Sequence, residues 1–137
     1  MAGELLVLDH QEAFFALSTD YEKICQLRLE PATSYLVFAR GDVSVVAGRV
    51  DLRLETPDAA DDTSFTQGHG GPPHFVEGHS TFSLMLATRV PADPGPDPDL
   101  FWAAMLSIRR DPNGGGAELN SVKLVALPVD HISFVTG

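Results

Sequence analysis

Three histidines stand five residues apart in one segment of the chain, at His69, His74 and His79, with Glu77 between the last two. Imidazole nitrogens and a carboxylate are ligands that suit Zn²⁺ or Ni²⁺. The same segment is dense in Gly and Pro, however, which predicts a loop. On a strand, Glu77 and His79 would share one face and His74 would point to the other. These four residues therefore form either a metal site or, as the simpler interpretation, a solvated loop whose histidines titrate near neutral pH.

Two acidic segments offer a second kind of site, because Ca²⁺ prefers carboxylate oxygens. Neither follows the spacing of an EF-hand loop, and the alternating prolines of the second segment favour an extended spacer. We therefore expect no cofactor, with Zn²⁺ or Ca²⁺ as the alternative. The acidic residues are Asp58, Asp61 and Asp62 in the first segment and Asp93, Asp97 and Asp99 in the second.

Nucleophilic chemistry finds little support in the chain. Cys25 alternates in phase with Leu27 and Leu29, as a small core residue does. Ser80 directly follows a histidine, but no Gly-x-Ser-x-Gly motif surrounds it. The glycines at 114–116 lack the Lys-Ser/Thr of a phosphate-binding loop. We expect no enzyme, and a cupin-like enzyme ranks last because it needs an inward-facing cluster of His and Glu where the predicted strands place apolar residues.

Alternation of apolar and polar residues is the dominant pattern of the chain, so we expect β-strands to position the candidate site residues. From Arg49 to Thr56 every second residue is apolar, which places Val50, Leu52 and Leu54 in a core. Similar runs recur with Gly- and Pro-rich turns between them, and Ala47-Gly48 is expected to be a tight turn. The sequence predicts a single domain over residues 1–137, an all-β antiparallel jelly-roll β-sandwich of about eight to ten strands.

Composition excludes several classes of partner. A formal net charge of -10 and a single cysteine among 137 residues argue against nucleic acid and against an intrachain disulfide. The same sign of charge disfavours anionic membranes, and no apolar run approaches the roughly 20 residues of a membrane helix. The first residues lack the basic start of a secretory signal. We expect a cytoplasmic protein, or one released without a classical signal peptide.

Two of the predicted strands are apolar on both faces. Ser34–Arg40 and Leu100–Arg109 carry large side chains at consecutive positions, as do central strands or strands at an obligate subunit interface. One sandwich core cannot easily absorb both faces of two strands. The predicted interface residues, for which the alternative is cover by the other sheet of the same chain, are Tyr35, Phe38, Phe101, Trp102 and Met105.

Three segments together resemble a known family. Residues 26–40 combine a leucine-rich strand, a Pro-containing turn and Tyr-Leu-Val; residues 83–87 read Ser-Leu-Met-Leu-Ala, and residues 120–130 contain Lys-Leu-Val-Ala-Leu. They are similar to the small bacterial jelly rolls related to the tumour-necrosis-factor and complement globular-head domains. The resemblance implies a ten-strand jelly roll, often trimeric, that serves binding or assembly rather than catalysis. It covers about half of the chain and neither the His-rich nor the Pro/Asp-rich segment.

These observations predict a non-catalytic oligomerisation or recognition module, with a homotrimer favoured. The alternative is a lectin-like or metal-dependent protein that binds a ligand through loops 57–79 and 91–99, since long unpaired loops suit binding. Its partners would be other copies of the chain, a protein or a carbohydrate, with neither nucleic acid nor membrane among them.

Overall fold

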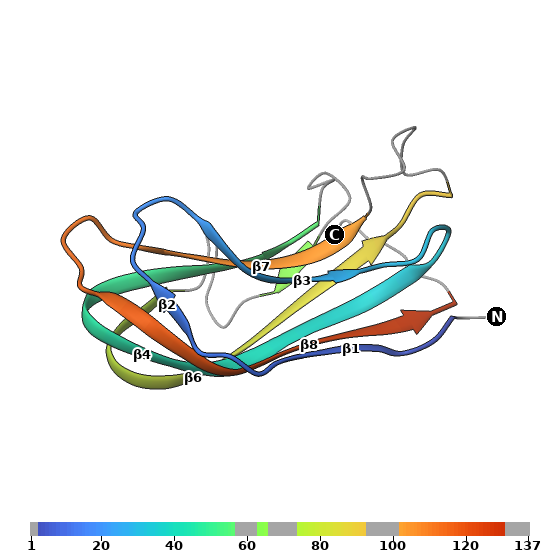
Figure 1. The fold of residues 1–137 in the computed structure, drawn as a ribbon. Coiled ribbons are helices and arrows are strands. Elements are labelled where there is room, and N and C mark those ends of the chain that lie inside the picture. The colour runs from blue at the N-terminus through green and yellow to red at the C-terminus, as the bar shows by residue number, and fades with distance from the viewer. Residues whose placement is uncertain (1–2, 57–62, 66–73, 93–101, 131–137) are drawn as a thin grey trace.

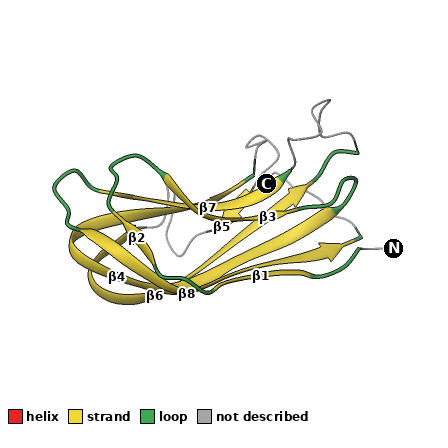
Figure 2. Ribbon diagram, in the orientation of Figure 1, coloured by secondary structure: helices red, strands yellow, loops and turns green. Residues whose placement is uncertain are grey.

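The computed structural model describes residues 3–56, 63–65, 74–92 and 102–130. Within these ranges the chain forms strands and no helix, so no helix there can cross a membrane (Figures 1 and 2). All of the strand pairings are antiparallel. The all-β antiparallel class is therefore confirmed, and the jelly-roll arrangement stays a prediction. The strands are β1 (Leu6–His10), β2 (Phe14–Ala16), β3 (Glu22–Arg28), β4 (Ser34–Glu55), β5 (Thr63–Phe65), β6 (His74–Arg89), β7 (Ala103–Arg110) and β8 (Gly116–Val129).

The long strand β4 belongs to two layers of sheet. Its first half, up to Val45, pairs with β8 on one side and β6 on the other. Its second half, from Val50, pairs with β7 and with the beginning of β6. Figure 1 shows β4 and β6 curving together at one end of the molecule, so that each contributes to both layers. The first layer has the order β1–β8–β4–β6–β5 with β2 also on β8, and the second has β3–β7–β4–β6.

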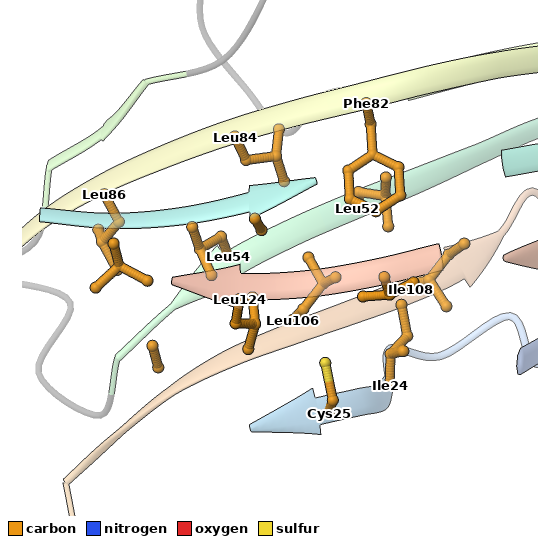
Figure 3. Packing of buried hydrophobic residues seen from close by; sticks show 14 of the residues in the cluster. Ile24, Cys25, Leu52, Leu54, Phe82, Leu84, Leu86, Leu106, Ile108 and Leu124 are labelled. Carbon is orange, nitrogen blue, oxygen red and sulfur yellow. The ribbon is translucent and has the colours of Figure 1, made fainter. Parts of the chain in front are cut away.

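The core lies between the two layers. Side chains of alternate residues point inward from both, so that Phe82 and Leu84 of the first layer approach Leu106 and Ile108 of the second (Figure 3). The prediction for the alternating segment is confirmed, because Val50, Leu52 and Leu54 are all buried. Tyr35 is also fully buried, and its hydroxyl accepts a hydrogen bond of 3.2 Å from the backbone N–H of Glu30. A buried Tyr thus keeps its polar atom satisfied.

The predicted tight turn at Ala47-Gly48 is wrong, because β4 continues through it. The register passes from Val45 opposite Gly78 to Arg49 opposite Val76, so three residues of β4 face one residue of β6. Such a bulge bends a strand without ending it. Gly48 has a φ of 76°, and a Cβ there would lie 2.7 Å from the Cα of Gly114. The bend therefore depends on two glycines that let the backbones meet.

A second bulge lies in β8, opposite Gly41 of β4. Alternation in β4 runs in phase through Gly41, and its pairing with β6 is continuous there. The register with β8 shifts between Arg40 and Asp42, and Ser121 carries the unusual positive φ of 57°. A Cβ on Gly41 would lie 2.8 Å from Cζ of Phe82 and 3.2 Å from Cγ2 of Val122. Gly41 thus leaves room for an aromatic ring in the core.

The substitution Gly41→Ala tests this packing. The new methyl group would lie 2.8 Å from Cζ of the buried Phe82 ring, so overpacking should lower the free energy of unfolding by about 1–3 kcal/mol. Urea denaturation of Gly41→Ala, Phe82→Leu and the double variant forms a thermodynamic cycle. The alanine should cost less in the Phe82→Leu background, with a coupling of at least about 0.5 kcal/mol. Strictly additive effects would contradict the proposed contact.

Candidate interaction surface

The outward side chains of the first layer form a continuous apolar patch, which follows from the strand registers. Val7 of β1 lies opposite Val125 of β8, and Val125 lies opposite Phe38 of β4. Phe38 in turn lies opposite Met85 of β6. Directly opposed residues in a sheet have Cβ atoms about 5 Å apart, so these side chains touch their neighbours in a row. A second apolar row beside the first contains Leu36 of β4 opposite Leu127 of β8, and Leu5 lies two residues before Val7. We call the two rows together the apolar face: Leu5, Val7, Leu36, Phe38, Met85, Val125 and Leu127.

Several of these side chains remain open to solvent. Leu5 is 56% exposed, Val7 54% and Leu127 41%. The other members of the apolar face are half-buried, and no second sheet formed by the described residues covers them. Single exposed apolar residues are normal on a protein surface, whereas a contiguous patch marks an interaction site. The apolar face is therefore the candidate functional surface of this chain.

The outer face of the second layer is charged instead. Asp51 of β4 is buried and accepts a hydrogen bond of 3.1 Å from Nε of Arg109, and Nε of Arg49 lies 3.3 Å from its other oxygen. The guanidinium carbons of Arg53 and Arg109 lie 4.0 and 4.6 Å from the centre of the Tyr21 ring. The hydrogen bond to Asp51 raises the pKa of Arg109, and burial raises the pKa of Tyr21. The charges of this face pair largely with one another, and its described residues form no contiguous apolar patch.

The four predicted interface residues with described positions lie in three environments. Phe38 lies in the apolar face, and Met105 lies half-buried on the outer face of the second layer. Tyr35 and Trp102 are buried in the core of their own chain, at 0% and 8% exposure, so they offer no surface to a second copy. For Tyr35 and Trp102, cover by the other sheet of the same chain, the alternative to an interface, accounts for their burial. Phe101 lies outside the described residues.

Several members of the apolar face were not among the predicted interface residues. Leu5 and Val7 belong to the alternating run at the start of the chain, and Leu127 belongs to the alternating run of β8. Alternation alone shows that each has a side opposite the core. It does not show that the outward sides of neighbouring strands coincide, which needs the register.

The predicted metal ligands are only partly described. His74 lies on β6 opposite Asp51, and His79 lies opposite Ser44, whose Oγ is 3.0 Å from its Nδ1. These two histidines are separated by roughly 15 Å of strand. Glu77 is exposed at the bend between them, and His69 lies outside the described ranges together with Asp58, Asp61, Asp62, Asp93, Asp97 and Asp99.

Among the residues with described positions, no three His, Cys, Asp or Glu side chains gather closely enough to hold a metal ion. The undescribed residues include members of both proposed ligand sets. The Zn²⁺ and Ca²⁺ sites therefore stay predictions.

Cys25 is a core residue, as its phase in β3 predicts. Its side chain lies between the layers with Leu106 and Ile24 nearby (Figure 3). Burial raises the pKa of the thiol from 9.0 to about 11. The nucleophilic thiolate is therefore absent at neutral pH, and the side chain acts as a small apolar group.

Alkaline titration should reveal the buried thiol. Because the folded state holds this proton more tightly than the unfolded state, the stabilisation is complete below pH 9.0 and is lost as the pH rises towards 11. The free energy of unfolding of the wild type, measured relative to that of Cys25→Ala, should fall by about 2–3 kcal/mol between pH 9.0 and about pH 11. Urea denaturation of both proteins at a series of pH values measures the difference. Parallel curves would show that the thiol is not buried.

No protein-family model matches this chain, and neither the curated proteins nor the solved structures contain a significant match to it. Its function therefore has to be inferred from its own side chains and surfaces.

Proposed function

We propose that this chain is a non-catalytic oligomerisation module of jelly-roll type, and that copies of it associate through the apolar face. The observation that carries the proposal is the contiguity of that face across β1, β8, β4 and β6. Burying apolar surface contributes about 25 cal/mol per Å² to association, and interfaces between permanently associated subunits resemble a core cut in half.

The pairing scheme supports the jelly-roll part of the proposal. If β4 and β6 are each divided at the bend, the chain has eight main segments, with β2 and β5 as short additions. The first segment pairs with the last (β1–β8) and the second with the last but one (β3–β7). The halves of β4 then pair with the halves of β6 in the same nested order. A long antiparallel hairpin rolled up in this way into two sheets is the jelly roll.

The resemblance to tumour-necrosis-factor-like and complement-head domains favours three copies. Apolar residues on the outward side of one layer, and charged ones on the other, are consistent with each copy meeting its neighbours through one layer only. The alternative function, ligand binding through loops 57–79 and 91–99, falls largely on residues without described positions. It stays a prediction.

A pair of surface substitutions tests the proposed assembly. Wild-type protein at micromolar concentration should sediment with a mass near three times the 14.7 kDa of one chain. Val7→Glu with Leu127→Glu places two charges in the apolar face at positions that are already exposed in the single chain. The variant should remain folded, because exposed sites tolerate substitution within about 0.5 kcal/mol. It should sediment as a monomer.

The matched control uses two valines that are more exposed than Val7 and Leu127 and lie outside the apolar face. Val46→Glu with Val76→Glu, at 68% and 62% exposure in the wild type, adds the same charge near the bend. This variant should keep the mass of the wild type. A monomeric wild type, or a Val7→Glu/Leu127→Glu variant that still assembles, would refute the proposal.

A further inference from the structure

Next to the apolar face, the outer surface of the first layer is hollowed. Two open hollows of about 530 and 280 Å³ lie on either side of Arg40, and both are also lined by Ser121. The larger one is bounded by Asp9, Asn120 and Lys123, and the smaller one by Asp42 and Ser83. The size of the larger one is within the range of small-molecule sites.

The bulge of β8 creates this surface. Leu119 and Val122 both point into the core. Two polar residues, Asn120 and Ser121, therefore lie between them on the outer side, where regular alternation would place one. Ser121 adopts its left-handed conformation here, at a φ of 57°. Bulges often re-aim side chains beside binding sites, and a side chain held in an unusual backbone conformation is a reason to look for such a site.

Two cations, Arg40 and Lys123, line the larger hollow. Arg40 and Lys123 are directly opposed in the pairing of β4 with β8. Like charges in that position repel each other. Among the residues of known position, no ion pair or side-chain hydrogen bond holds either cation, although Asp9 lies opposite Lys123 in the next pairing. An anion placed between the two cations would relieve the repulsion and gain charge-assisted hydrogen bonds from both.

The remaining lining residues restrict the kind of anion. Asp9 in the larger hollow and Asp42 in the smaller one beside it are acceptors when ionised, so they repel a multiply charged ligand, and Asp9 requires a donor such as a hydroxyl group. Asn120 and Ser121 can both donate and accept. A compact ligand with one carboxylate and several hydroxyl groups meets these requirements.

We propose that the larger hollow binds a sugar acid, with its carboxylate between Arg40 and Lys123 and its hydroxyl groups on Asp9, Asn120 and Ser121. The proposal is independent of self-association. It concerns the polar rows that continue the sheet beyond Val7 and Phe38, and it uses neither the apolar face nor the loops at residues 57–79 and 91–99.

Ligand-observed saturation-transfer NMR with D-glucuronate tests the proposal. The wild-type protein should bind with a Kd of about 1 mM or below, and D-glucose at the same concentration should give no saturable signal. Arg40→Gln and Lys123→Gln should each weaken glucuronate binding about tenfold, because each removes one charge-assisted contact. The matched control, Lys23→Gln, removes an exposed lysine of β3 in the second layer and should bind as the wild type does.

Two further measurements decide whether the details hold. The Leu127→Glu variant, whose new charge lies about 13 Å along β8 from Lys123, should bind glucuronate as the wild type does, whatever its oligomeric state. Acetate and inorganic phosphate should displace glucuronate from the protein only with inhibition constants at least about tenfold above the Kd of glucuronate. Absent glucuronate binding, unchanged binding by Arg40→Gln, or equal competition by acetate would overturn the proposal.

Discussion

The structure depends on the requirement that β4 serve both layers at once. Over most of its length both edges of this strand are paired, first with β8 and β6 and then with β7 and β6. Its backbone therefore sets the register of the three other long strands. The strand passes between layers only where Gly48 and Gly114 let two backbones approach. The adjoining hairpin is fastened to the bend by backbone hydrogen bonds from Gly115 to Ala47 and from Asp111 to Arg49, both 2.8 Å long.

One consequence is that both outer faces are fixed by the same register. A slip of one residue would turn every side chain of a strand to the opposite face. With β4 held on two sides, a local adjustment is possible only where a bulge absorbs a residue, as at Ser121 of β8. The apolar rows and the polar rows of the first layer are therefore adjacent but separate. The same bulge that keeps Val122 in the core brings Asn120 and Ser121 to the surface.

Alternation in the sequence was sufficient to predict the strand class and much of the core, because period-two burial is a local property of a strand. Val50, Leu52 and Leu54 are examples. It could not distinguish a bend from a turn at Ala47-Gly48, since glycine serves both and the difference lies in which strand approaches it. The bulge in β8 did leave a signal: Leu119 and Val122 are three residues apart, which breaks the alternation of a single strand. The partners of Phe38 across the sheet could not be predicted, because they come from strands distant in sequence.

The two proposed activities of the first layer differ in their physical basis, and salt separates them. Each copy carries a formal net charge of -10, so copies repel one another and association through an apolar face must overcome that repulsion. At physiological ionic strength the Debye length is about 8 Å, so added salt screens the repulsion and favours assembly. An anion between Arg40 and Lys123 is held by charge at an open surface, and the same screening weakens it. Added salt should therefore strengthen assembly and weaken the binding of an anion in the hollow. This opposite response distinguishes a surface for self-association from a site for a charged ligand, although both lie on the first layer.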